Sequence, residues 1–497
     1  MLESLNLAVN FFLADWMTIV YLMLGVLIGV LFGVIPGLGG TTAVALLLPL
    51  TFGMQPEQAI TLMGGILGSS AIGGSVAAIL LNAPGTAPNA ATCFDGYPMT
   101  RQGKAGIAIG AAMAASSIGG LIGVAILIVV LPITKSIVLM FGPPAFFMLA
   151  VLGLTSLTVA SGNLLRGLLA ACIGLMIGFV GYDDFGGTQR YTFDSNFLWD
   201  GISLVPTLIG LFAIAEMIKL YVEGGAIAKD TDPTKIKLAG TSLGIKSVFS
   251  NMPTVFSGSI IGSIVGMVPG VGGTVASFLA YSFASQFTRK NNHFGSGDVR
   301  GVIAPEAANN AKDGGSLIPT LAFGIPGSAE MALFLGVLIM HGMTPGPMLL
   351  IEREWSIMVL IIALALATLM ASLVVLASAK LLVMISFLNS AIIIPAVLAI
   401  SLVGAYALNA HMGDVVVAVI FGFIGYMMIK FEFPRITLVI ALVLGSMMER
   451  SFLQSITIFR GDWTGFFRDT TSLIIFCLVV LALAFPTVHK IRGMLAK

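Results

Sequence analysis

The sequence predicts an all-α polytopic membrane protein built from two inverted structural repeats with broken helices and re-entrant hairpins. Three observations support this class: an apolar composition, an internal repeat, and glycine-rich segments that cannot continue a regular helix. Of 497 residues, 57% are hydrophobic and 9% are charged, whereas about one-quarter of a soluble domain is charged. The mean hydropathy of +1.03 agrees, because so few charges could not solvate a soluble protein of this length.

Composition also excludes several classes of protein. A net charge of +1 offers no basic surface, so we expect no nucleic-acid partner. The three cysteines form no CxxC pair and the four histidines lack metal-ligand spacing, so we expect no resident cofactor or metal. Residues 1–16 carry Glu3 and Asp15 but no Lys or Arg, which argues against a secretory signal and favours an interfacial segment.

Apolar runs suggest many membrane crossings, because a helix needs roughly 20 residues to span the hydrocarbon layer. Candidate spans lie at 17–35, 105–131, 144–161, 163–181, 199–219, 247–268, 355–386, 391–408, 413–430, 434–448 and 470–487. Other apolar stretches are too short or too rich in glycine for simple spans. We expect half-helices and hairpins in these stretches, at 39–52, 58–82, 271–286 and 301–340.

An internal repeat organises the chain. Three segments recur in the same order: 25–43 with 258–276, PGTA at 84–87 with PGSA at 326–329, and GFVGY at 178–182 with GFIGY at 422–426. Both copies of the first segment read G-x3-G-x3-G-x2-P-G-x-G-G. We therefore predict two transmembrane repeats, at 17–222 and 250–455, joined by a cytoplasmic linker at 223–249. An interfacial segment at 1–16 precedes them, and a loop, an extra transmembrane helix and a cytoplasmic tail follow at 456–497.

Basic residues suggest how the halves are oriented. Lysines gather in the linker and basic residues at the carboxyl end, and the positive-inside rule places both in the cytoplasm. Because one extra span follows the second half, that half must cross the membrane an odd number of times. The two halves are then inverted repeats, an arrangement common in secondary transporters.

The duplicated glycine segment predicts a broken membrane helix. Glycines four apart share one helix face, on which another backbone packs closely. The Pro-Gly pair then ends the helix, and Thr41 or Thr274 lies near the start of the next. Free N–H groups at such a break attract an anion, and free carbonyls attract a cation such as sodium. The alternative is a glycine-packed helix that ends in an ordinary turn.

The second repeated motif, Pro-Gly-(Thr/Ser)-Ala, predicts a further break beside the first. Asn82, Thr86, Asn89 and Ser328 offer neutral donors and acceptors, which suit a carboxylate that must later be released; a capped turn without ligand is the alternative. The predicted substrate-binding residues are Gly37, Gly39, Gly40, Thr41, Asn82, Gly85, Thr86, Gly270, Gly272, Gly273, Thr274, Gly327 and Ser328. The residues predicted to hold a coupling ion are Thr41, Thr274, Ser328 and Asn310.

Charged residues also occur within the apolar second half. The segment APEAANNAKDGGSLIP at 304–319 contains Glu306, Lys312 and Asp313. Ionisable residues at membrane depth are functional candidates. The same segment also fits an interfacial loop, and both interpretations stay open at this point.

These motifs resemble the large membrane subunit, the permease, of the tripartite tricarboxylate transporter family. The resemblance covers nearly the whole chain and rests on 25–40, 258–273, NAPGTAPNAATCFDGYPM at 82–99 and APEAANNAKDGGSLIPTLAFGIPGSAEMALFLG at 304–336.

The resemblance implies a multi-pass permease of the bacterial inner membrane. Its implied partners are a small four-span membrane subunit and a periplasmic solute-binding protein, which delivers citrate or another small carboxylate. Uptake would be driven by sodium or protons without ATP, and a hairpin-bearing domain would move like an elevator.

The alternatives to a transporter are a passive channel and an intramembrane enzyme. A passive channel for small anions stays open, because inverted repeats also occur in channels. An intramembrane enzyme needs a placed acid, base, nucleophile or metal pair. The sequence shows no His-x-x-x-His and no paired intramembrane aspartates, so we expect no enzymatic activity.

Overall fold

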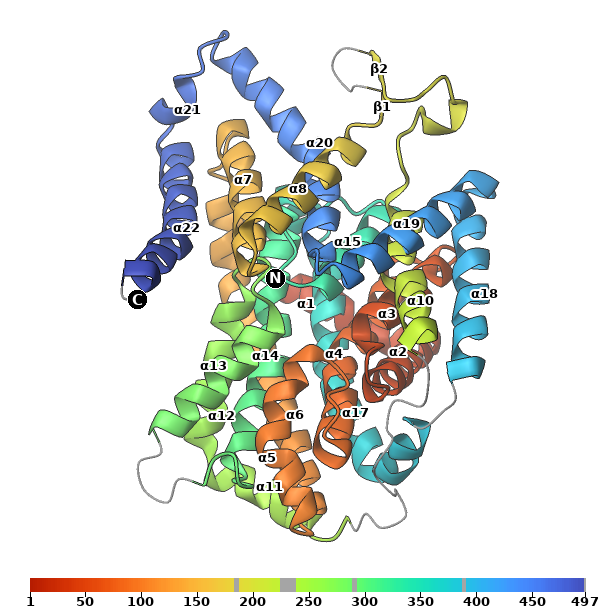
Figure 1. The fold of residues 1–497 in the computed structure, drawn as a ribbon, viewed down its shortest axis with the longest axis vertical. Helices are drawn as coiled ribbons and strands as arrows, with labels where there is room; N and C mark the ends of the chain where they lie inside the picture. The colour runs from red at the N-terminus through yellow and green to blue at the C-terminus, as the bar shows by residue number, and fades with distance from the viewer. Residues whose placement is uncertain (183–186, 224–237, 288–292, 387–389, 496–497) are drawn as a thin grey trace.

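The protein is almost entirely helical (Figure 1). The computed structural model describes residues 1–182, 187–223, 238–287, 293–386 and 390–495. Nine helices in these ranges are long and apolar enough to cross a membrane, or ten if the bent pair α11–α12 is one span. The one sheet among the described residues is an antiparallel pair, β1 (Gly181–Tyr182) with β2 (Gln189–Arg190). The predicted all-α polytopic class is confirmed.

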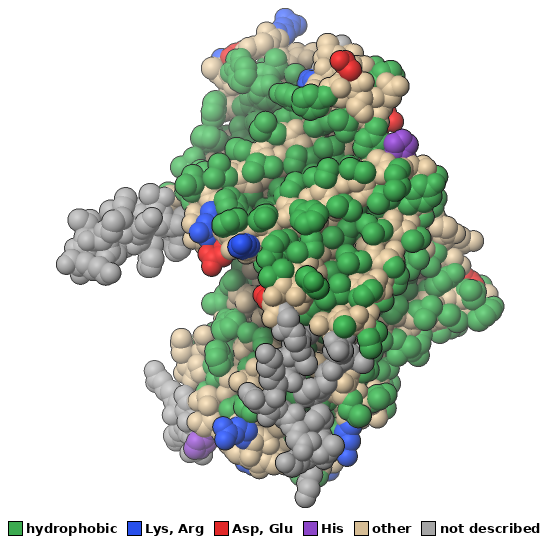
Figure 2. Space-filling view, turned by 45° about the vertical axis from the view of Figure 1, so that its right-hand side comes forward, with side chains coloured by type: hydrophobic (Ala, Val, Ile, Leu, Met, Phe, Trp, Pro, Cys, Tyr) green, Lys and Arg blue, Asp and Glu red, His purple; other side chains and the backbone are tan. Residues whose placement is uncertain are grey.

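The surface agrees with a membrane environment. Figure 2 shows hydrophobic side chains over most of one face, with charged side chains near its upper and lower ends and a small group of them at mid-height on the left. Many of the exposed side chains are large and apolar, such as Leu165, Phe249 and Leu373. Lipid rather than water solvates such a surface.

The helices form a central body with two groups beside it (Figure 1). The central body contains α1 (Leu2–Ala14), α2 (Trp16–Val34), α3 (Gly39–Leu47), η1 (Pro49–Thr51), α4 (Pro56–Leu81), η2 (Ala87–Asn89), α5 (Ala90–Arg101), α6 (Ala105–Val138), α11 (Thr241–Ser250), α12 (Met252–Gly266), α13 (Gly272–Phe287), α14 (Arg300–Phe323), α15 (Ala329–Met340), α16 (Pro347–Glu352) and α17 (Glu354–Ile385).

The flanking groups contain the remaining helices. One holds α7 (Pro143–Ala160), α8 (Leu164–Gly178), α20 (Arg435–Ile458), α21 (Gly465–Arg468) and α22 (Thr470–Leu495). The other holds α9 (Leu204–Leu208), the π-helix η4 (Ile209–Ile214), α10 (Ala215–Glu223), α18 (Ser390–Asn409) and α19 (Met412–Lys430). A short helix, η3 (Asn196–Leu198), follows the β1–β2 hairpin.

Of the segments predicted as half-helices and hairpins, 58–82 instead forms a continuous helix, whereas 301–340 does contain a break. Residues 58–81 lie in the 26-residue helix α4, which Asn82 caps. In 301–340, the 24-residue helix α14 ends at Phe323 and α15 begins at Ala329. The interpretation of 304–319 as an interfacial loop is wrong, because these residues lie within the buried helix α14. Helices α4 and α14 are both enclosed by other helices, so many of their glycines face neighbouring backbones.

The two halves pack in corresponding ways. Helix α2 contacts α4 in the first half, and α12 contacts α14 in the second. Helix α4 also packs on α17 of the second half, while α14 packs on α6 of the first. The halves therefore exchange partners, as expected of two intertwined copies. Their inverted orientation and an elevator movement stay predictions.

The predicted linker is only partly described. Residues 224–237 lie outside the described ranges, and the helix α11 follows before the chain bends by 79° into α12. The amino-terminal helix α1 packs against α17.

Candidate functional site

The glycine faces of α2 and α12 lie directly on the central helices. A β-carbon built on Gly25 would lie 2.2 Å from the Leu62 carbonyl oxygen of α4. One built on Gly262 would lie 2.3 Å from the Ala308 carbonyl oxygen of α14. Neither distance leaves room for a side chain, so the predicted close backbone packing is confirmed in both halves.

Both predicted helix breaks are present. The Pro-Gly-x-Gly segment separates α2 from α3 in the first half and α12 from α13 in the second. Gly37 and Gly39 have φ of +89° and +61°, and Gly270 and Gly272 have φ of +76° and +70°. Only glycine adopts this left-handed backbone without strain, which explains why these residues stand in both copies.

The Pro-Gly-(Thr/Ser)-Ala loops press against the same breaks. A β-carbon on Gly85 would lie 1.9 Å from the carbonyl oxygen of Gly33, near the end of α2. In the second half, a β-carbon on Gly327 would lie 2.8 Å from the carbonyl oxygen of Gly266, where α12 ends. Each loop is therefore fixed beside the break of its own half.

The two breaks and the two loops surround one cavity of about 570 Å³, here called the central cavity. The predicted residues in its wall are Gly37, Gly39, Gly40, Thr41, Gly85, Thr86, Gly270, Gly272, Gly273, Thr274 and Ser328. Helices α3, α13 and α15 all begin at this wall. Residues more than 200 positions apart in the chain thus meet at one site.

Three predicted site residues lie outside the wall of the central cavity. Asn82 is exposed and ends α4 in the left-handed conformation, with φ of 54°. Gly327 is buried within its loop, facing Gly266 and Ser316. Asn310 is buried toward α4, where its Nδ2 donates to the carbonyl oxygen of Gly68 at 3.4 Å.

The cavity wall also carries charges on α14 and α15. The buried Lys312 places its Nζ 2.5 Å from Oδ1 of Asp313 and 3.3 Å from Oε2 of Glu330. Lys312 and Glu330 both line the cavity. Beside them, both polar side-chain atoms of Asn309 are buried and have no hydrogen-bond partner in the part of the chain that the structure describes. An unpaired buried amide is available to a ligand.

A second cation reaches the cavity from the flanking helices. Arg435, at the start of α20, donates from Nη2 to Oε1 of Glu216 at 2.6 Å and from Nη1 to the carbonyl oxygen of Leu211 at 2.8 Å. Its guanidinium carbon lies 5.2 Å from the ring centre of Phe212. Arg435, Glu216 and Phe212 all line the cavity, so its wall joins the central body to both flanking groups.

Sequence reasoning marked part of this set and missed the rest. Lys312 was a candidate because its charge stands within an apolar region. Arg435 and Glu216 gave no such signal, because each lies at a span end, where charged residues are common. Only the packing of distant helices brings them to the cavity.

The comparison with known families decides which family this chain belongs to. The profile described as "Tripartite tricarboxylate transporter TctA family" matches residues 19–440. The chain belongs to the tripartite tricarboxylate transporter TctA family. It is therefore the membrane subunit of a tricarboxylate transporter, and the tripartite system of this family includes partner subunits.

Relatives of this TctA-family protein occur in Agrobacterium vitis. An uncharacterized 52.8 kDa protein in the TAR-I ttuC' 3' region is 33% identical over 445 residues, covering 89% of this chain and 88% of its own. An uncharacterized protein in the TAR-II ttuC' 3' region is 32% identical over 234 residues, covering 46% of this chain and 97% of its own. No solved structure matches the chain.

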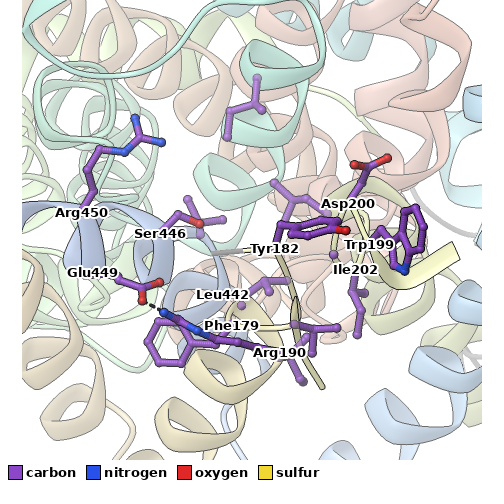
Figure 3. A pocket seen from close by; sticks show the side chains of 17 residues that line it. Phe179, Tyr182, Arg190, Trp199, Asp200, Ile202, Leu442, Ser446, Glu449 and Arg450 are labelled. Carbon is purple, nitrogen blue, oxygen red and sulfur yellow. Dashed lines mark hydrogen bonds and ion pairs between the residues drawn. The ribbon is translucent and has the colours of Figure 1, made fainter. Parts of the chain in front are cut away.

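The TctA-family chain has a second cavity beside the β1–β2 hairpin, here called the loop cavity. It measures about 450 Å³ and is lined by Tyr182, Arg190, Trp199, Glu449 and other residues (Figure 3). An ion pair between Nη1 of Arg190 and Oε1 of Glu449, at 2.5 Å, lies in its wall. It contains none of the predicted site residues, although part of the duplicated GFVGY segment at 178–182 lines it.

Proposed function

We propose that this protein takes up small organic carboxylates, such as tricarboxylates, across the bacterial inner membrane by ion-coupled secondary transport. A small four-span membrane subunit and a periplasmic binding protein that delivers the solute would complete the system. Sodium ions or protons would drive accumulation. Membership of the TctA family and the geometry of the central cavity support the proposal.

The observation that carries this proposal is the convergence of helix starts. Helices α3, α13 and α15 begin at the wall of the central cavity. The first N–H groups of a helix have no partner within the helix, and its amino end carries roughly half a positive charge. Three such ends around one cavity favour a small molecule with several carboxylates.

The charged side chains fit reversible binding. Lys312 and Arg435 attract an anion, but each is already paired with acidic side chains. An entering carboxylate must share these cations with Glu330 or Glu216, which limits how tightly it is held. We propose that Ser328 and Thr86 complete the site. Ser328 already accepts the Met331 N–H at the start of α15, at 3.3 Å, so its own hydrogen can point to a ligand.

The position of the cavity fits alternating access. Its wall combines breaks and loops of the central body with Phe212 and Arg435 of the flanking groups. A displacement of the central body relative to those groups would open the cavity to one side or the other. An elevator movement of the kind expected from the sequence would use this boundary.

Substitution of the duplicated glycines tests the assignment. The complex, reconstituted in vesicles, is assayed for citrate uptake with Gly39→Val and Gly272→Val. Gly162→Val is the matched control, because Gly162 also has positive φ (+77°) and open space around it but lies outside the cavity. We expect both cavity variants to lose uptake more than about tenfold, since a β-branched residue at positive φ distorts the backbone that lines the cavity. The same strain at Gly162 lies away from the cavity and should leave uptake near the wild-type rate. Equal uptake in all three variants would overturn the site assignment.

Collapse of the ion gradient separates this proposal from a passive channel. A coupled transporter stops accumulating citrate above the outside concentration when the gradient is removed. A channel never accumulates it against a gradient, with or without the ions.

A further inference from the structure

A buried carboxylate lies on α14, two turns before Lys312. Glu306 is 0% exposed and accepts hydrogen bonds from four neutral side chains. The hydroxyls of Ser75 and Thr92 are each 2.5 Å from its oxygens, the Ser116 hydroxyl is at 3.0 Å, and Nδ2 of Asn89 is at 3.3 Å. These donors come from α4, α5, α6 and η2, so Glu306 joins four elements of the central body to α14.

Glu306 lacks a cationic partner. None of the ion pairs formed among the described residues includes it, and the next cation on its helix, Lys312, is already paired with Asp313 and Glu330. A buried carboxylate without a counter-charge is costly to ionise, and such residues in membrane proteins commonly serve transport.

The hydrogen bonds around Glu306 fit either protonation state. The Ser75 hydroxyl lies within hydrogen-bonding distance of both Oε2 of Glu306, at 2.5 Å, and the Ala71 carbonyl oxygen, at 3.1 Å. Because a hydroxyl has one hydrogen, it can donate to only one of them. Ionised Glu306 accepts from Ser75, whereas protonated Glu306 donates to Ser75, which then donates to Ala71. A rotated hydroxyl thus accommodates the added proton.

A short chain of hydrogen bonds connects Glu306 to the central cavity. Thr86 lines the cavity and donates from Oγ1 to Oδ1 of Asn89 at 2.5 Å. The other end of the same amide, Nδ2 of Asn89, donates to Oε1 of Glu306. A carboxylate that accepts the Thr86 hydrogen must take it from Oδ1 of Asn89, so its binding changes the hydrogen bonding of the amide that donates to Glu306.

We propose that Glu306 is the proton-carrying residue of this transporter, so that the coupling ion is a proton. The inference rests on the proposed function and deepens it. With the cavity open to the outside, Glu306 takes up one proton from water as the carboxylate binds. After the cavity opens to the cytoplasm, the carboxylate leaves and Glu306 returns the proton to water on that side.

Other titratable groups face this region from the surrounding helices. Cys93 and Asp95 come from α5 and Tyr281 from α13, while Lys312 and Asp313 follow on α14 itself. Asp95 accepts the Tyr281 hydroxyl at 2.8 Å and backbone N–H groups before α14, so it is occupied elsewhere. Helices α4 and α6 face Glu306 with hydroxyl groups. Cys93 donates to the backbone carbonyl of Asn89 at 3.7 Å, whereas Glu306 accepts from the Asn89 side-chain amide that is linked to Thr86.

Glu306→Gln in the reconstituted complex tests the proposal through two activities. Net uptake driven by a pH gradient needs the proton to bind and leave, whereas exchange of citrate across the vesicle membrane does not. We expect the variant to lose net uptake at least about tenfold and to retain exchange within about twofold. Glu57→Gln is the matched control, since Glu57 is a buried carboxylate of α4 that accepts from Ser356 and lies outside the cavity. It should retain both activities.

Unchanged accumulation by Glu306→Gln under a pH gradient would overturn the proposal. If the variant loses both activities, infrared difference spectra of the wild-type complex with and without citrate decide instead. A carboxylic-acid band that changes with citrate and shifts in Glu306→Asp supports the proposal, and its absence overturns it. Wild-type uptake driven by sodium alone would refute the proton but leave carboxylate transport standing. Absence of any citrate exchange in the wild type would refute the proposed function itself.

Discussion

The two repeats share a backbone but differ in charge. The shift of 242 residues that aligns PGTA with PGSA places Lys312 opposite Ser70 and Asp313 opposite Ala71. In both halves a central helix supports a glycine-rich break and a Pro-Gly loop. Of these two central helices, α14 places an ionisable side chain, Lys312, in the cavity wall, whereas α4 places none there. The comparison teaches that duplicated glycines build the frame of the site, whereas unduplicated residues supply its charge.

The largest expected difference between the repeats is at this pair of positions. Lys312→Met leaves Asp313 and Glu330 without their cation, which should destabilise the protein by about 3–5 kcal/mol. Ser70→Ala removes a buried hydroxyl that has no partner among the described residues, so its effect should be close to zero. Thermal unfolding of both variants in detergent measures the contrast. Similar unfolding temperatures for the two variants would show that the Lys312 charge does not contribute to stability.

Substitution of the tightly packed glycines, in contrast, should lower stability by similar amounts in the two repeats. A β-carbon on Gly33 would lie 2.1 Å from the Ser70 carbonyl oxygen, and one on Gly266 would lie 2.4 Å from the Lys312 carbonyl oxygen. We expect Gly33→Ala and Gly266→Ala each to lower stability by about 1–3 kcal/mol through overpacking. Gly53→Ala is the control, because nothing lies near that position. A loss confined to one half would contradict the view that the copies play the same structural part.

The smallest expected difference concerns how α4 and α14 begin. Helix α4 starts with Pro56 and no side-chain cap, whereas Asp298 precedes α14 and accepts from the backbone N–H and side chain of Arg300 at 2.9 Å. Burial raises the pKa of Asp298, but the hydrogen bonds and charge of Arg300 outweigh it and hold the pKa below the usual value.

Asp298→Asn should therefore lower stability by about 1 kcal/mol at neutral pH, while Gln55→Ala in the first repeat changes little. Because the folded-state pKa is depressed, this contribution is present above the unfolded-state pKa. It is lost as pH falls through the folded-state value. The difference between wild type and Asp298→Asn should thus shrink on acidification, as unfolding curves over a pH series would show. A difference independent of pH would exclude a role for the charged form.

The sequence predicted the parts of the fold that depend on local chemistry. Gly37, Gly39 and their copies require a left-handed backbone, so the breaks could be placed from the residues alone. The continuity of α4 could not, because its many glycines disfavour a helix unless close neighbours enclose it. That of α14 could not either, because Pro305, Pro319 and its buried charges are typical of a loop when neighbours are unknown. Arg435 was also missed, since only the packing of α20 brings it to the cavity.

The central claim is that helix starts from both repeats hold one carboxylate in the central cavity. A cryo-electron microscopy map of the complex with citrate in lipid nanodiscs tests it most directly. The account predicts ligand density in contact with the backbone at Gly39–Thr41 and Gly272–Thr274, near Lys312. Density in the loop cavity beside Arg190 and Trp199, with the central cavity empty, would contradict it.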